Sequence, residues 1–337
     1  MKTTLKLLAS FAIGTMMMFS CQKAEEPVDS TMNEPQTRAY GDTPVVAMYV
    51  ETNDVNPLNA GDYELTDGTP FVGIVELFAS NIEKTVVNGV TQPTLKLNDK
   101  MTRVLEPDPN APTTTGYHKY VKPLQDKGIK VLLTVLGNWQ DMGVANMNDT
   151  QTTQFAQIVA YVVNRYNLDG VGFDDEYAGY TSTNNTSYSQ IIKKVRNLLP
   201  NKIITVFDWG NTDTLDAEAL AMIDYAYHGF FGTSFISSGL VDKSRWSPMS
   251  LNLGYNYNTY LSTIYNNALR AKNEGYGALM CFNLRRTSDV NSTNVFITMA
   301  SAMYGQSVVC DGGDRPQDWD FISTGLTFTY ADVLNAQ

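Results

Sequence analysis

Three consecutive carboxylates, Asp174, Asp175 and Glu176, follow a short apolar run at 170–173. Side chains alternate between the two faces of a strand, so Asp174 and Glu176 share one face and Asp175 takes the other. Two carboxyls two residues apart repel each other, which raises the pKa of at least one of them. A carboxylic acid that stays protonated near neutral pH can serve as a general acid, so this spacing predicts acid–base chemistry. The alternative interpretation is a solvated turn between a strand and a loop.

The elements that must position these carboxylates alternate along the chain. The segment 152–167 carries apolar residues at the i, i+3, i+4, i+7 and i+8 positions of an amphipathic helix. Eight β-rich runs predict strands at 45–51, 71–79, 130–138, 170–176, 202–210, 223–231, 249–255 and 276–284. This alternation favours an α/β fold, a single (β/α)8 TIM-type barrel over 44–305. A doubly wound open sheet is the alternative, although no G-x-G-x-x-G turn follows the first run.

In a β/α barrel the carboxyl ends of the strands meet at one mouth, where catalytic side chains project. Aromatic residues form 11% of the chain, and those at strand ends are candidate platforms on which sugar rings stack. These aromatic candidates are Tyr49, Trp139, Tyr177, Trp209, Tyr227, Phe230 and Phe282. The alternative for each is an ordinary core position, and the polar loops around Trp139 and Trp209 make these two the preferred platforms. Asn138 and Asn283 are candidates for binding sugar hydroxyls, or for satisfying loop backbones.

The string LDGVGFDDEYAGY at 168–180 resembles the D-G-x-D-x-D-x-E signature of glycoside hydrolase family 18. It resembles in particular the DDEY form found in the endo-β-N-acetylglucosaminidase branch. Segments that agree in order and spacing are VVAMYVETNDVNPLN, LFASNIE, LQDKGIKVLLTVLGN, IDYAYHGFFGT and EGYGALMCFNL. The resemblance covers residues 44–305 and implies hydrolysis of the β-1,4 bond between the two core GlcNAc residues of N-glycans. It therefore implies an N-glycan or N-glycoprotein as substrate and partner.

The resemblance also implies a role for each catalytic carboxylate. Glu176 matches the glutamate that protonates the departing glycosidic oxygen and then acts as the base for water. Asp174 matches the carboxylate that orients the 2-acetamido group of the substrate, whose carbonyl oxygen is the nucleophile of a retaining, oxazolinium-forming mechanism. Glu51 matches a position that lines the site. No metal or organic cofactor is implied.

Two positions depart from the family pattern. Gly172 stands where the signature usually has its middle aspartate, and Asp208 on the neighbouring strand is a candidate replacement, a substrate-binding residue or a turn residue. Phe230 aligns with a tyrosine that contacts the acetamido group, which leaves Tyr227 three residues earlier. These departures keep open two alternatives, a glycan-binding barrel with weak or no activity, and a chitinase.

The composition excludes several other classes of protein. The chain has 337 residues, of which 43% are hydrophobic, and a formal charge of −11 that disfavours nucleic-acid binding. Two histidines and three cysteines argue against a multi-histidine metal site and a disulfide framework. Cys281 and Cys310 remain candidates for a single bridge. We expect a monomer.

The amino terminus has the pattern of an export signal. Two lysines, a short apolar run and Ser20 precede Cys21, which predicts a lipoprotein signal peptide at 1–20 and lipidation of Cys21. Polar residues and prolines predict a flexible tether at 22–43. We therefore expect lipid anchoring to the outer membrane of a Gram-negative bacterium, facing outward. The remaining predictions are glycan-selecting loops at 84–116, 177–188 and 232–248, and a C-terminal extension at 306–337.

Overall fold

The computed structural model describes residues 43–108, 111–284, 292–310, 315–316 and 324–336. All of them belong to the unit Pro35–Gln337. The predicted signal peptide, Cys21 and the tether up to residue 42 lie outside the described residues. No described helix is both long and apolar enough to cross a lipid bilayer.

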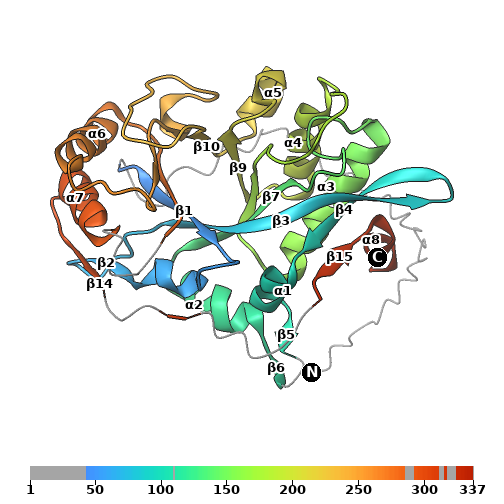
Figure 1. Ribbon diagram of the computed structural model, residues 1–337, viewed down its shortest axis with the longest axis horizontal. Helices are drawn as coiled ribbons and strands as arrows, with labels where there is room; N and C mark the ends of the chain where they lie inside the picture. Colours follow the sequence, from blue (N-terminus) through green and yellow to red (C-terminus); the bar gives the residue numbers. More distant parts are fainter. Residues whose placement is uncertain (1–42, 109–110, 285–291, 311–314, 317–323, 337) are drawn as a thin grey trace, which may run out of the picture. The chain divides into compact units, whose positions relative to one another are not determined.

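Parallel strands surround a common interior and almost close into a barrel (Figure 1). The strands pair in the order β11-β10-β9-β8-β7-β3-β1-β13-β12. Their bounds are Val45–Glu51 (β1), Ile74–Val87 (β3), Lys130–Gly137 (β7), Gly170–Phe173 (β8), Ile203–Asp208 (β9), Tyr225–His228 (β10), Trp246–Ser247 (β11), Ser250–Asn252 (β12) and Ala278–Phe282 (β13). The predicted TIM-type fold is confirmed.

The seventh strand of the barrel differs from its prediction. In place of one strand at 249–255, the structure has two short strands: β11 lies before the predicted run and β12 lies within it. β11 pairs with β10 and β12 pairs with β13, so the break falls where the barrel closes. A single bridge between Phe231 and Ser250 spans the gap.

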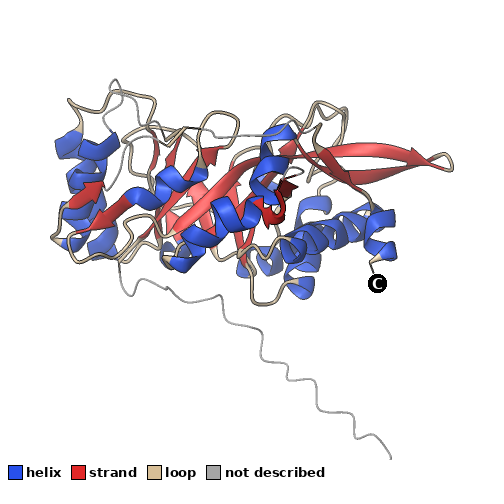
Figure 2. Ribbon diagram, turned by 90° about the horizontal axis from the view of Figure 1, so that it is seen from below, coloured by secondary structure: helices blue, strands red, loops and turns tan. Residues whose placement is uncertain are grey.

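Helices flank the strands on the outside (Figure 2). They are Asp99–Leu105 (α1), Lys122–Asp126 (α2), Asp149–Arg165 (α3), Ser187–Leu198 (α4), Ala217–Ala221 (α5), Leu261–Glu274 (α6) and Ser292–Tyr304 (α7). Two connections depart from a regular strand–helix alternation. A 3-10 turn, Pro57–Asp62, and the short strand β2, Tyr63–Leu65, join β1 to β3, and among regular elements only the 3-10 turn Lys243–Arg245 lies between β10 and β11.

The alternation of side chains divides each barrel strand between two apolar layers. One face of β1, with Val45, Ala47 and Tyr49, belongs to the cluster inside the barrel. The other face, with Met48 and Val50, belongs to the larger layer between strands and helices. Because both faces are buried, the strands read as continuous apolar runs in the sequence.

The prediction of a loop at 84–116 is wrong. β3 continues to Val87, turns, and returns as the antiparallel strand β4, Val90–Leu97, which precedes α1 and the short pair β5, Pro107–Asp108, and β6, Ala111–Thr115. The hairpin continues beyond the carboxyl ends of the neighbouring strands (Figures 1 and 2). Asn81 fixes its base by donating to the carbonyl of Gly137 at 3.1 Å. Pro93 in β4 is tolerated in part because this strand lies off the barrel.

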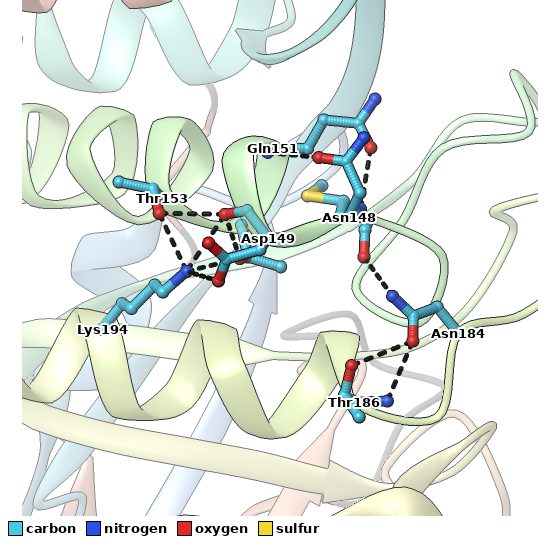
Figure 3. Close-up of polar contacts among 9 residues, drawn as sticks. Asn148, Asp149, Gln151, Thr153, Asn184, Thr186 and Lys194 are labelled. Atoms are coloured by element: carbon cyan, nitrogen blue, oxygen red, sulfur yellow. Dashed lines mark hydrogen bonds and ion pairs between the residues drawn. The ribbon is translucent and has the colours of Figure 1, made fainter.

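The segment at the start of α3 contacts the loop that follows β8 (Figure 3). Asn148 and Gln151 form a reciprocal capping box at the first turn of α3. Asn184 donates to the carbonyl of Met147 at 2.7 Å, and Lys194 of α4 contacts Asp149 at 2.7 Å. Asn184 thereby fastens the predicted loop 177–188 to the segment before α3, and Lys194 joins α4 to α3.

The chain beyond the barrel adds strands at two separate places. β14, Val308–Cys310, pairs with β2, and β15, Leu326–Phe328, pairs with β4 before the last helix, α8, Tyr330–Asn335. Arg315 forms an ion pair with Asp62 at 2.9 Å. Cys281 and Cys310 are both free thiols, so the candidate bridge between them is not formed.

Candidate active site

The two candidate catalytic carboxylates lie just beyond the end of β8. Main-chain hydrogen bonds continue past this strand, from Asp174 to the carbonyl of Val135 at 3.1 Å and from Gly137 to the carbonyl of Glu176 at 2.9 Å. The alternation of β8 therefore persists as far as Glu176. Gly172, Asp174 and Glu176 share the inward face, as the spacing predicts.

Asp175 takes the opposite face and has a structural role. Its carboxylate accepts hydrogen bonds from the hydroxyl of Tyr180 at 2.5 Å and from the main chain and side chain of Asn211 at 2.9 and 2.7 Å. It thereby ties the segment after β8 to the turn after β9. Only two of the three consecutive carboxylates are left to face the mouth of the barrel.

Burial changes the acidity of both inward carboxylates. Asp174 is 3% exposed, and burial raises its pKa well above the usual range, with further increases from Glu176, Asp175 and Glu76. Half-burial raises the pKa of Glu176 as well. Oδ1 of Asp174 has no hydrogen-bond partner among the described residues. The pair thus combines a protonatable, half-buried acid with a deeply buried carboxyl.

A third carboxyl, Glu76 of β3, lies inside the barrel. It is fully buried and accepts hydrogen bonds from the hydroxyls of Thr205 at 2.6 Å, Thr134 at 3.2 Å and Tyr227 at 3.4 Å. A Cβ added at Gly172 would collide with Oε2 of Glu76 and would lie 2.7 Å from the hydroxyl oxygen of Thr205. The carboxyl of Glu76 therefore fills the space beside Gly172.

Asp208 does not replace the missing aspartate. Register pairs Gly172 with Thr205, and Thr205 and Phe207 face the barrel interior, so Asp208 faces the other side of β9. Its carboxylate instead accepts a hydrogen bond from Thr212 at 2.7 Å. The hypothesis that Asp208 compensates for Gly172 is wrong, while its role in substrate binding stays a prediction.

Tyr49 and Tyr227 differ from the expected sugar platforms because both rings are buried inside the barrel. Their ring centroids lie 5.8 Å apart in an edge-to-face arrangement. Burial and then the charge of Glu76 raise the pKa of each phenol. The hydroxyl of Tyr49 has no hydrogen-bond partner among the described residues. These tyrosines therefore supply hydroxyls below the mouth rather than exposed ring faces.

Two exposed aromatic pairs lie at the ends of successive strands. Trp139 is 72% exposed, and its ring centroid lies 5.6 Å from that of Tyr177. Trp209 and Phe230 meet edge to face at 5.1 Å. All four rings are accessible, as stacking on a sugar requires. Their assignment as substrate-binding residues stays a prediction that this exposure favours.

The alignment of Phe230 with an acetamido-contacting tyrosine is wrong. Tyr227 points inward from β10, and alternation brings Phe231 rather than Phe230 to the same side. Phe231 stacks on Phe207 at 5.7 Å and on Phe282 at 5.3 Å. Phe230 is 64% exposed, so it does not remove a hydroxyl from the interior.

The polar candidates at the strand ends have local partners. Asn138 donates to Glu83 of the hairpin at 2.5 Å, and Asn283 donates to Asn252 at 3.1 Å. Glu51 accepts from Asn53 at 2.9 Å, and its charge contributes to the raised pKa of Tyr177. Glu51 therefore lies within electrostatic range of the mouth, whereas Asn138 fastens the hairpin.

Four functional candidates were missed in the sequence: Glu76, Thr134, Thr205 and Phe231. Glu76 carries a usable signal, because it is the one charged residue in the run 71–79. A buried charge in an apolar strand needs partners and is a candidate functional residue. No group of histidine, cysteine and carboxylate side chains suited to a metal ion occurs in the part of the chain that the structure describes.

Comparisons with known proteins identify enzymes that are similar to this chain. No family profile matches the chain. Endo-β-N-acetylglucosaminidase F1 of Elizabethkingia meningoseptica is 30% identical over 294 residues, which cover 80% of this chain and 81% of the relative. An endo-β-N-acetylglucosaminidase of Flavobacterium sp. (strain SK1022) is 32% identical over 285 residues, covering 81% and 85%. The structure of EndoBT-3987 from Bacteroides thetaiotaomicron with Man9GlcNAc2Asn shares the fold, with a TM-score of 0.67, 23% identity and coverage of 89% and 74%.

Proposed function

The chain belongs to the endo-β-N-acetylglucosaminidases of glycoside hydrolase family 18, and from this membership we propose that it cleaves the β-1,4 bond between the two core GlcNAc residues of N-linked glycans. The observation that carries the proposal is the placement of Asp174 and Glu176 on one inward face at the mouth of the barrel. Their raised pKa values suit acid–base work on a glycosidic bond.

Glu176 is the general acid and base of the proposed mechanism. Its half-buried carboxyl retains a proton to higher pH than a solvated one and donates that proton to the departing glycosidic oxygen. The carbonyl oxygen of the substrate's 2-acetamido group attacks the anomeric carbon as this bond breaks. The resulting carboxylate of Glu176 then takes a proton from water, which opens the oxazolinium ring with net retention of configuration.

Asp174 orients the acetamido group for this attack. Its unpartnered Oδ1 is an acceptor for the N–H of that group. Ionising a buried carboxyl is unfavourable in the empty site, but the positive charge that develops on the oxazolinium ring offsets this cost in the transition state. Asp174 thus stabilises the transition state more than the bound substrate.

The test is incubation of the purified protein with Man9GlcNAc2Asn, a biantennary complex glycopeptide and linear chitin oligomers. The products should be a free glycan ending in one GlcNAc and an asparagine that keeps the other. Cleavage of chitin oligomers alone would favour a chitinase, and glycan binding without turnover would favour a binding protein. Failure of every glycopeptide to be cleaved would refute the proposal.

Two variants sharpen this test. Glu176→Gln keeps the shape of the side chain but has no proton to donate, so it should lower the rate by about two to four orders of magnitude and spare binding. Asp175→Asn is the matched control, because this neighbour faces away from the mouth. Its effect on the rate should be far smaller, and unchanged turnover in Glu176→Gln would show that Glu176 is not the acid.

We also propose that Cys21 is lipidated and anchors the barrel to the outer membrane, facing outward. The support is the pattern of lysines, apolar residues and Ser20 before Cys21. In cells fed a labelled fatty acid, the wild type should carry the label and remain with membranes. Cys21→Ala should lose both properties, and a labelled Cys21→Ala protein would refute the lipidation site.

A further inference from the structure

We propose that Glu76 is a positioning residue for Asp174, and that Gly172 is required because its missing side chain makes room for the carboxyl of Glu76. This inference rests on the proposed function, because its effect is read in glycan cleavage. It assigns a role to a residue on the second barrel strand, far from the catalytic segment in sequence.

Glu76 lies beside Gly172 inside the barrel. Residues two apart on a strand are separated by about 7 Å and point the same way. The carboxyl of Glu76 lies against the missing Cβ position of Gly172, immediately below Asp174 on the same inward face. It therefore occupies the barrel interior next to the carboxylate that orients the acetamido group.

Three hydrogen bonds hold the carboxyl of Glu76 in place. Thr134 of β7, Thr205 of β9 and Tyr227 of β10 donate hydroxyl hydrogen bonds to the two oxygens of Glu76. Donors from three different strands converge on one carboxyl, which confines it to a single orientation. A carboxyl held in one orientation keeps its charge and its volume at a fixed position beside the neighbouring side chains.

Burial raises the pKa values of the carboxyls in this part of the barrel, and neighbouring charges add to the increase at Asp174. Burial raises the pKa of Glu76 to about 7, although its three hydroxyl donors oppose the shift. The groups that face Glu76 from the packed strands are Tyr49, Thr134, Asp174, Thr205 and Tyr227. The negative charge of Glu76 also raises the pKa of Asp174. An ionised Glu76 therefore disfavours ionisation of Asp174, which helps to keep Asp174 protonated in the empty site.

Side chains at positions 172 and 76 compete for the same volume inside the barrel. An aspartate at position 172 would need the volume that Glu76 now fills, and a smaller residue at position 76 would leave that volume empty. A carboxyl can therefore be supplied from β8 or from β3, but not from both strands. This chain supplies it from β3.

A transfer of the carboxyl between strands tests the inference. The variants are Glu76→Gln, Glu76→Ala, Gly172→Asp and the double variant with Glu76→Ala and Gly172→Asp, assayed on whichever glycopeptide the wild type cleaves. Glu76→Gln should lower kcat by about tenfold or more while KM changes by less than about threefold, because the lost stabilisation concerns the transition state. The double variant should recover about tenfold in kcat over Glu76→Ala. Gly172→Asp alone should be the least stable of the set.

Asp224→Asn is the control for removal of a buried carboxylate. Asp224 is 2% exposed and pairs with Arg196 at the amino end of β10, away from the mouth. This variant should lose stability and keep its kcat.

Two results would overturn the inference. One is a Glu76→Gln enzyme with wild-type kcat and KM, and the other is a folded double variant no faster than Glu76→Ala. If the double variant melts below the assay temperature, the Glu76→Gln comparison decides alone. A wild type that cleaves no glycopeptide would instead refute the proposed function.

Discussion

Gly172→Ala should damage both the stability and the activity of this enzyme, although it adds a single methyl group. The new Cβ would lie 2.7 Å from the hydroxyl oxygen of Thr205 and would also collide with Glu76. Ordinary van der Waals contacts are longer, and neither neighbour can rotate away without breaking the hydrogen bond between them. Overpacking of this kind costs about 1–3 kcal/mol of unfolding free energy.

This cost converts into a measurable change in melting temperature. Unfolding entropy is about 2.1 cal/mol/K per residue, which gives about 0.6 kcal/mol/K for a folded unit of roughly 290 residues. Gly172→Ala should therefore lower Tm by about 2–5 °C. A shift of the Glu76 carboxyl by about 1 Å should also lower kcat, by about 10- to 100-fold.

Thermal melts followed by circular dichroism and glycopeptide cleavage below Tm measure the two effects. Gly61→Ala is the matched control, because its Cβ would meet a methyl group of Leu124 at 2.6 Å. That methyl group lies at the end of a rotatable side chain, so Tm should fall less and kcat should not change. Wild-type Tm and kcat in Gly172→Ala would refute the close contact between Gly172 and Glu76.

Three further predictions test other parts of the site. Asp174→Asn removes the charge that stabilises the oxazolinium ring, so kcat on the cleaved glycopeptide should fall about 100- to 1000-fold, and a loss below tenfold would contradict that role. Trp139→Ala should raise KM about 2- to 10-fold with little change in kcat, because stacking contributes about 0.5–1.5 kcal/mol, whereas Tyr265→Ala on the outer face of α6 should leave KM unchanged. Because the pKa of Glu76 is about 7 in the folded protein and 4.5 is its ordinary value, the folded state binds more protons between these values. The unfolding free energy should therefore fall by about 3 kcal/mol as pH rises through this window, and urea titrations should show a flatter dependence for Glu76→Gln.

The sequence was sufficient for the parts of this protein that depend on local patterns. Alternation along one strand is a local property, and it correctly separated Asp174 and Glu176 from Asp175. The apolar runs also located the barrel strands. The hairpin was missed because β4 contains Pro93 and many polar residues, a composition that is typical of loops. Its pairing with β3 and β15 stabilises it as a strand.

The order of residues within a strand did not reveal which of the two strand faces points into the barrel. In β9, both faces carry apolar residues and each also carries one polar residue, Thr205 on one face and Asp208 on the other, so the pattern does not show which face points inward. Pairing with β8 decides the question, because Thr205 lies beside Gly172 and binds Glu76. The same reason explains why Phe230 was placed inward in error.

The sequence by itself determined where along the chain the candidate chemistry lies. It placed a carboxylate pair after the fourth strand of an α/β barrel, within a glycosidase family pattern. Only the tertiary structure decided what lies beneath that pair. Glu76 and Gly172 are far apart in the chain, and their contact exists because β3, β7 and β8 are adjacent in the closed sheet. In the motif, Gly172 is the loss of an aspartate, whereas in the barrel it leaves room for the carboxyl of Glu76 from another strand. The reason is that all the strands around a packed interior share its volume.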